Sequence, residues 1–278
     1  MGVLSRRSRG PERTGPPDFV GVGSQGTATQ WWHRLLLQHP AIRKPDGRRE
    51  LHFFDRLCTR EMTDEDVAEY HARFPRRPGE LTGEWTPRYM YDPWTPVLLQ
   101  RAAPDAKLIA MVGDPIERYR LRLQEERGED VSEQVFMTDA VERGRYATQL
   151  KHLRAFFPAE RILVLQHERC RRDPVGEYRR TLRFLGLDEA SVPKPVLIAG
   201  GQAEHWYAPI ARTLRLHRIA RRDRPPAERP ERERVELWPD IVASLREELE
   251  PEVRELQELV PELDLSLWRN FAPAPVPA

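Results

Sequence analysis

The sequence predicts an α/β fold in which a parallel sheet is flanked by helices. Short apolar runs alternate along the chain with amphipathic stretches whose apolar residues recur near the 3.6-residue period of a helix. A turn rich in glycine follows the first apolar run and leads into the first amphipathic stretch. Strands that alternate with helices over this length are typical of a parallel sheet, because each helix carries the chain back to the same end of the sheet.

The expected elements follow one another in a regular order. The apolar runs expected as strands cover Asp18–Gly23, Leu51–Asp55, Lys107–Val112 and Arg161–Gln166. The stretches expected as helices cover Thr27–His39, Thr95–Arg101, Pro115–Arg127, Val141–Phe156 and Pro174–Leu185. Ligands of such sheets bind beyond the carboxyl ends of the strands, so chemistry is expected in the loops after Gly23, Asp55 and Val112.

Composition narrows the class of protein. The chain has 278 residues, of which 39% are hydrophobic and 32% are charged, and this is enough apolar content for the core of one large domain. Its 45 Lys and Arg residues against 44 Asp and Glu residues leave a formal charge of +1. No overall field would then hold a nucleic acid or an anionic membrane, so neither is expected as a partner. No apolar run approaches membrane-spanning length.

The two ends of the chain differ in composition from the rest. Residues 1–16 carry arginines without the apolar stretch of a secretory signal, and residues 271–278 are mostly Pro and Ala. We expect both to be disordered tails, because they have few side chains that could offset the entropy of ordering. The folded domain is expected over residues 17–270, with an exposed loop over residues 221–234 ahead of the final helices.

Cysteine usage points to a reducing compartment. Cys58 and Cys170 are the two cysteines, and they lie far apart without a CxxC motif or a Cys/His ladder. Neither a disulfide framework nor a zinc site is indicated, so we expect no metal. His167–Arg171 is not an HExxH motif because its last residue is not histidine. A reduced cytoplasm fits these observations best.

The first turn can be interpreted in several ways. Gly21–Gly26 matches GxGxxG after a predicted strand and before a predicted helix, where free backbone N–H groups could hold a phosphate. A dinucleotide site would need an acidic residue ~20 residues on, and Asp55 lies farther away. A nucleoside triphosphatase would need Lys-Ser/Thr after Gly26, where Thr27 and Ala28 stand.

A third interpretation takes in more of the chain. Pro17–Thr29, followed by Leu35–Pro40, resembles the opening strand, phosphosulfate loop and first helix of sulfotransferases that use 3'-phosphoadenosine 5'-phosphosulfate (PAPS). Glu50–Asp55 resembles the Glu-x-His-Phe-Phe-Asp strand of the carbohydrate (heparan-type) and related bacterial sulfotransferases. Further similar segments follow in the family's order at Gly83–Tyr91, Pro104–Ile109, Asp114–Tyr119, Arg145–Leu150, Ile162–Leu165, Phe184–Leu187 and Asp264–Trp268. The resemblance implies the P-loop-type three-layer architecture of that family.

On the acceptor side, the resemblance implies a base and its neighbours. Glu50 occupies the position of the carboxylate that takes the acceptor's proton, and Arg49 occupies that of a preceding basic residue. Strand alternation would place His52 and Phe54 on the same face as Glu50. Without the resemblance, a glutamate at a strand edge is usually solvated and a single histidine usually completes a core hydrogen bond, so both alternatives stay open.

On the donor side, the resemblance implies that PAPS binds at the first loop and at the end of the third expected strand. The implied donor-binding positions are Ser24, Gln25, Gly26, Thr27, Ala28, Thr29, Gln30, Gly113 and Leu121. Several of them lack the family's residue: Gly26 stands for a loop lysine, Gly113 for an arginine and Leu121 for a serine, and Trp85 replaces a second lysine. Each charge-assisted contact contributes about 1.5–3 kcal/mol, so we expect strongly weakened affinity for PAPS.

Two functions follow from the resemblance. The first is sulfuryl transfer from PAPS to a hydroxyl or amine of a small molecule or sugar, with a carbohydrate or other small molecule as the acceptor. The second is a divergent family member that no longer uses PAPS, and is either repurposed for acid/base chemistry or is a non-catalytic binding protein. Neighbouring arginines could restore the donor site or be ordinary helix-surface charges, and these are Arg34, Arg118, Arg120 and Arg122.

Overall fold

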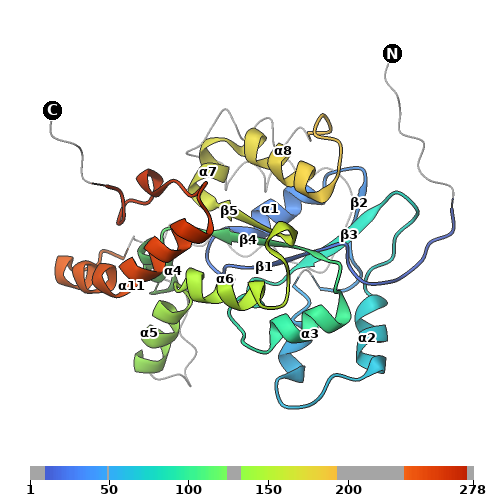
Figure 1. The fold of residues 1–278 in the computed structure, drawn as a ribbon, viewed down its shortest axis with the longest axis horizontal. Coiled ribbons are helices and arrows are strands. Elements are labelled where there is room, and N and C mark those ends of the chain that lie inside the picture. The colour runs from blue at the N-terminus through green and yellow to red at the C-terminus, as the bar shows by residue number, and fades with distance from the viewer. Residues whose placement is uncertain (1–9, 49, 124–132, 193–234, 274–278) are drawn as a thin grey trace, which may run out of the picture.

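The protein forms a five-stranded parallel sheet with helices on both faces (Figure 1). The structure is a computed structural model that describes residues 10–48, 50–123, 133–192 and 235–273. The strand order is β2-β3-β1-β4-β5, and the strands cover Phe19–Gly23 (β1), Ile42–Arg43 (β2), Leu81–Trp85 (β3), Lys107–Val112 (β4) and Ile162–Gln166 (β5). The α/β fold class predicted from the sequence is therefore confirmed.

The central strands are buried on both faces. In register, Phe19 of β1 lies opposite Gly83 of β3 and Lys107 of β4, and Leu108 lies opposite Ile162. All five residues of β1 and of β5 are buried. A parallel sheet covered by helices on both faces needs continuous apolar strands, which explains why β1, β4 and β5 stood out as apolar runs.

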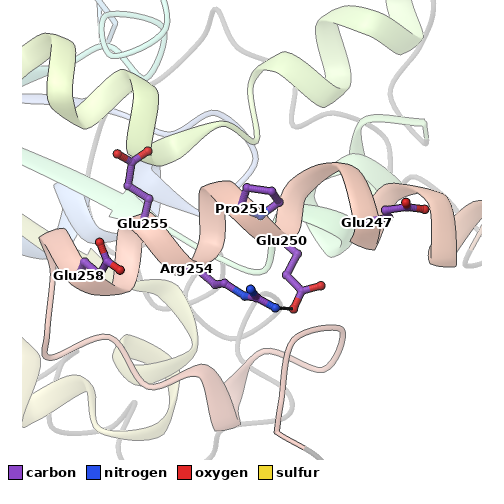
Figure 2. A pocket seen from close by; sticks show the side chains of 6 residues that line it. All are labelled: Glu247, Glu250, Pro251, Arg254, Glu255 and Glu258. Atoms are coloured by element: carbon purple, nitrogen blue, oxygen red, sulfur yellow. Dashed lines mark hydrogen bonds and ion pairs between the residues drawn. The ribbon is translucent and has the colours of Figure 1, made fainter.

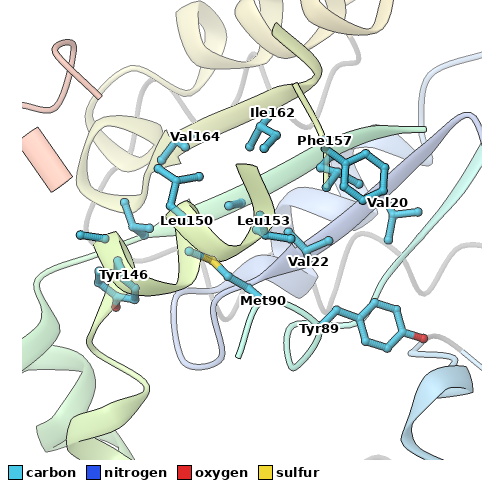
Figure 3. Close-up of a cluster of buried hydrophobic side chains, with 14 of the residues drawn as sticks. Val20, Val22, Tyr89, Met90, Tyr146, Leu150, Leu153, Phe157, Ile162 and Val164 are labelled. Carbon is cyan, nitrogen blue, oxygen red and sulfur yellow. The ribbon is translucent and has the colours of Figure 1, made fainter. Parts of the chain in front are cut away.

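Helices complete the three layers. They cover Thr29–Leu36 (α1), Asp64–His71 (α2), Thr95–Ala102 (α3), Pro115–Leu123 (α4), Glu133–Glu142 (α5), Tyr146–Arg154 (α6), His167–Arg172 (α7), Pro174–Leu185 (α8) and Pro239–Leu259 (α11). One core lies under α1, α7 and α8, where Trp32 packs near Tyr178. The other core lies under α2, α3, α4, α6 and α11, and Figure 3 shows Leu150 and Leu153 of α6 packed over the strands there.

The expected strand over residues 51–55 is wrong. His52 has a left-handed backbone with φ of 49°, and Phe53–Leu57 form a short 3-10 helix (η1). The backbone N–H groups of residues 51–53 are bound by side chains from the segment that follows β3, so they are not available to a neighbouring strand. The sheet uses β2 and β3 at this edge instead.

The long helix expected over residues 141–156 is two helices. α5 ends at Glu142 and α6 begins at Tyr146. Gly144 lies in the turn between them, where an added Cβ would meet the carbonyl oxygen of Val141 at 3.0 Å and the Cβ of Pro115 at 3.2 Å. A side chain at this position would crowd Val141 and Pro115, and a glycine avoids that crowding.

The two expected tails and the expected loop over residues 221–234 lie largely outside the described residues. Arg13, in the expected N-terminal tail, exchanges two backbone hydrogen bonds with Arg76. Residues 1–9, 221–234 and 274–278 lie outside the described residues. No helix in the described ranges has the length and apolarity needed to cross a membrane.

Candidate functional site

The first loop lies at the carboxyl ends of the central strands. Ser24 follows β1 and donates its hydroxyl to the carbonyl of Met111 on β4 at 2.9 Å, and Thr27 donates to the same carbonyl at 3.0 Å. Positive φ angles at Gly26 and Ala28 turn the chain into α1. The backbone N–H groups of residues 25–28 have no backbone acceptor within the described parts of the chain. The loop is therefore tied to the sheet by its hydroxyls, and its amides remain available for an anion.

Arg118 of α4 is buried against this loop. A Cβ added at Gly26 would lie 3.3 Å from the Cγ of Arg118, and Arg118 is 3% exposed. Burial lowers the pKa of its guanidinium, and burial raises the pKa of the nearby Tyr146 hydroxyl, although Arg118 partly offsets the second effect. The interpretation of Arg118 as a helix-surface charge is wrong, because α4 turns this residue toward the core.

Arg143 is a second cation at the loop. Its Nη1 donates to Oε1 of Gln25 at 2.7 Å, and its Nε donates to Asp139 of α5 at 2.7 Å. Its guanidinium also lies 4.2 Å from the centre of the Tyr91 ring. Arg143 was not predicted as a site residue, since an arginine near a helix end has no local mark that distinguishes it from a surface charge.

The acceptor-side residues form a chain of polar contacts. Gln30, in the first turn of α1, donates its side-chain amide to Oε1 of Glu50 at 2.6 Å. The Nε2 of His52 lies 3.3 Å from Oε2 of Glu50, and the Nδ1 of His52 lies 3.0 Å from Oδ2 of Asp55. All these side chains are partly exposed. The arrangement holds a solvent-accessible carboxylate beside the loop, where it can accept a proton.

Glu50 and His52 lie together as predicted, but the predicted cause is wrong. They were expected on one face of a strand, but they meet because the chain turns sharply at His52. Phe54 was expected on the same face and instead is fully buried between Tyr70 and Tyr89. Arg49 lies outside the described residues.

The positions that the resemblance implied for donor binding differ in their burial and in the element on which they lie. Gly113 follows β4 and lies beside the loop, because an added Cβ would meet a methyl carbon of Thr27 at 3.4 Å and Oε1 of Glu168 at 3.3 Å. Leu121 lies on α4 with 42% of its surface exposed. Trp85 is buried and covers Gly21 on the α1 side of the sheet. Ala28 and Thr29 begin α1.

The end of the described chain packs beside Gly113. The indole N–H of Trp268 donates to Glu168 at 3.0 Å, and Glu168 also accepts from the backbone of Asp114 at 3.0 Å. Asn270 donates its backbone and side-chain N–H groups to Asp114 at 2.9 Å each. The closing segment thus braces the turn from β4 to α4.

Other features of the surface lie apart from this site. A depression along α11 is lined by Glu247, Glu250, Pro251, Arg254, Glu255 and Glu258, and it shares no residue with the first loop or the Glu50 cluster (Figure 2). Among the described residues, no group of three or more His, Cys, Asp or Glu side chains is placed to hold a metal ion.

Comparison with curated proteins finds sulfotransferases. A model of the sulfotransferase family matches residues 93–191. Human heparan sulfate glucosamine 3-O-sulfotransferase 6 is 31% identical over 200 residues, which cover 66% of this chain and 56% of that protein. Human heparan sulfate glucosamine 3-O-sulfotransferase 3B1 is 30% identical over 187 residues, which cover 62% of this chain and 46% of that protein. The chain spans about half the length of the curated relatives it matches.

Comparison with solved structures finds the same fold. The sulfotransferase from Alicyclobacillus acidocaldarius matches with a TM-score of 0.62 and 23% identity, over 91% of this chain and 98% of that chain. The sulfotransferase STF9 from Mycobacterium avium matches with a TM-score of 0.50 and 15% identity, over 91% and 78% of the two chains. The family match and the curated relatives show that the chain is similar in sequence to sulfotransferases, and these two structures show that it has their fold.

Proposed function

We propose that the chain transfers a sulfuryl group from PAPS to a hydroxyl or amine of a sugar or other small molecule, with Glu50 as the general base. The observation that carries this proposal is the chain of contacts from Gln30 through Glu50 and His52 to Asp55, beside a loop whose amides can bind an anion. A base, an orienting imidazole and an anion site at one sheet edge are what sulfuryl transfer requires.

The reaction assigns a task to each residue on the acceptor side. Glu50 takes the proton from the acceptor as the acceptor oxygen or nitrogen bonds to sulfur. The bond between sulfur and the bridging phosphate oxygen breaks, and adenosine 3',5'-bisphosphate leaves with the electron pair. His52 and Gln30 each contact one oxygen of Glu50, which limits the rotation of the carboxylate and keeps it directed at the acceptor.

The donor side fits an anion through residues that differ from those the family resemblance implied. The loop itself contributes backbone N–H groups, while Arg143 contacts Gln25 and Arg118 lies against Gly26. The Nη2 of Arg118 donates to the carbonyl of Ala140, and its Nε is buried with no hydrogen-bond partner within the described residues, so a donor of this guanidinium beside the loop is still unused. We propose that these two arginines supply the positive charge that lysines of the loop would otherwise supply.

The curated relatives suggest which acceptors to test first. Their names state that they act on heparan sulfate glucosamine, so sulfated glucosamine oligosaccharides are the first acceptors to test. Cys58 and Cys170 are both free, which supports our proposal of a reducing compartment such as the cytoplasm.

The second candidate is a family member that has lost PAPS. The loop Ser24–Gln30 contains neither lysine nor arginine, and the implied donor position Leu121 is an exposed apolar side chain. Under this alternative, Glu50 and His52 serve other acid/base chemistry or only contact a bound molecule.

Calorimetric titration with adenosine 3',5'-bisphosphate separates the two candidates. Under our proposal, binding is saturable and is followed by transfer of labelled sulfate from PAPS to an oligosaccharide. Absence of binding at millimolar nucleotide would favour the alternative. Submicromolar affinity would show that the expected weakening of the donor site does not occur and that the neighbouring arginines restore it fully.

A further inference from the structure

Glu84 is a fully buried carboxylate that accepts a hydrogen bond from the residue next to the proposed base. It lies on β3, is 0% exposed, and accepts a hydrogen bond from the hydroxyl of Tyr70 of α2 at 2.8 Å. Thr86 donates its hydroxyl to Glu84 at 2.7 Å, and Tyr89 donates to it at 3.3 Å. A carboxylate in such surroundings is costly to bury unless its acceptor capacity is used, and here several donors converge on it.

The same group of side chains binds three consecutive backbone N–H groups of the segment that follows Glu50. Leu51 donates to Oε2 of Glu84 at 3.4 Å and to the hydroxyl of Thr86 at 3.1 Å. His52 donates to Thr86 at 3.4 Å, and Phe53 donates to the hydroxyl of Tyr89 at 2.9 Å. Glu84 is thus connected to this segment both directly and through Thr86 and Tyr89.

The segment needs such support, because His52 adopts a backbone conformation that residues other than glycine rarely occupy. Its φ of 49° persists only where the surroundings determine it. This turn brings the imidazole between Glu50 and Asp55. If the N–H groups of Leu51 and His52 lost their acceptors, the turn could relax and the imidazole would move away from Glu50.

We propose that Glu84 is a positioning residue that acts through the Leu51–Phe53 backbone to hold Glu50 and His52 in their active arrangement, and that its protonation releases this hold. This proposal adds a positioning residue to the proposed sulfuryl transfer, and its expected effect on kcat rests on that proposed function. It does not depend on that function for its structural effect, which can be measured on the resting protein.

The direction of the pH effect follows from the hydrogen bonds. Each contact to Glu84 is made by a donor, so its ionised form satisfies them all, whereas a proton on one oxygen removes an acceptor site. Burial raises the pKa of Glu84 to about 7, with the bonds from Thr86, Tyr70 and Leu51 acting in the opposite direction. Tyr70 and Tyr89 have pKa values well above 10 and stay donors, while Glu50, His52 and Asp55 are the charged or titratable groups on the supported segment.

Kinetics of Glu84→Gln provide the first test, once turnover of the wild-type protein has been measured. We expect kcat of the wild type to fall as pH decreases through about 7, and the variant to lose about tenfold or more of kcat at pH 8 with little change in KM for PAPS. Glu177→Gln is the matched control, because Glu177 is a buried carboxylate of α8 paired with Arg169 and Arg180. A pH profile of Glu84→Gln that equals that of the wild type and the control would overturn the inference while the proposed function stood.

The backbone amides provide a second test that needs no activity. In a His52→Asn background, which removes the imidazole and tolerates the left-handed turn, the Leu51 amide resonance should shift with a midpoint near pH 7. The added Glu84→Gln change should abolish that shift. A Leu51 resonance that does not respond to pH in this background, or that responds equally in both variants, would contradict the role of Glu84 even if no sulfotransferase activity were found.

Discussion

The side-chain amide of Gln30 donates to Oε1 of Glu50 at 2.6 Å and so joins the first turn of α1 to the segment that precedes η1. One end of this contact lies in the helix that follows the loop proposed to bind the donor, and the other end is the proposed base. The two halves of the proposed site are therefore joined by a hydrogen bond to a charged group, which is stronger than one between neutral groups.

Replacing the base tests the acceptor side. Glu50→Gln keeps the size of the side chain but removes the proton acceptor, so kcat should fall by ~10²–10⁴. The side chain is partly exposed, and the melting temperature should stay near that of the wild type. Single-turnover transfer of labelled sulfate measures the effect. An unchanged rate with a normal melting temperature would remove Glu50 from the mechanism and favour the binding-protein alternative.

Removing the amide of Gln30 tests whether it orients Glu50. Gln30→Ala eliminates a hydrogen bond to a carboxylate, which contributes about 1.5–3 kcal/mol, so kcat should fall by about 10- to 150-fold. Gln38→Ala, an exposed position just after α1, is the control and should leave kcat unchanged. Equal rates in the two variants would show that Glu50 is held adequately without Gln30.

Removing the charge of Arg143 tests the donor side. Arg143→Gln should weaken binding of adenosine 3',5'-bisphosphate by about 10- to 150-fold, since one charge-assisted contact is lost. Calorimetry gives the Kd directly. Arg183→Gln is the control, because Arg183 lies on α8 and its ion pair with Glu189 is exposed. A Kd that is the same in both variants would assign the positive charge at the loop to another residue.

The stability of the protein should depend on pH through Glu84. Its folded pKa of about 7 lies above the ordinary value of 4.5 for a glutamate, so the folded state binds the extra proton between these values and stability falls as pH rises through them. The loss should be on the order of 3 kcal/mol. Urea unfolding of the wild type and Glu84→Gln from pH 4.5 to 8 measures it. A slope that is the same in both proteins would show that Glu84 does not titrate in this range.

The central part of the fold could be predicted from local pattern. β1, β4 and β5 are mostly apolar because helices cover both faces of the sheet, and that composition is visible in a short window of sequence. β3 was missed because Thr82 and Glu84 are buried polar residues whose partners come from other elements. A short stretch of sequence around Glu84 shows the carboxylate but not the distant hydroxyl of Tyr70, whose hydrogen bond helps to make its burial possible.

The sequence by itself was enough to predict the α/β class, the loop after β1 and the proximity of Glu50 and His52. Tertiary structure alone decided that Glu50 and His52 meet across a turn, that Arg118 is buried, and that Arg143 reaches the first loop. Arg143 and Gln25 are 118 residues apart, and Glu84 and Leu51 are 33 apart. Contacts over such separations depend on where each helix returns to the sheet, and that placement results from the packing of the whole core rather than from any local propensity.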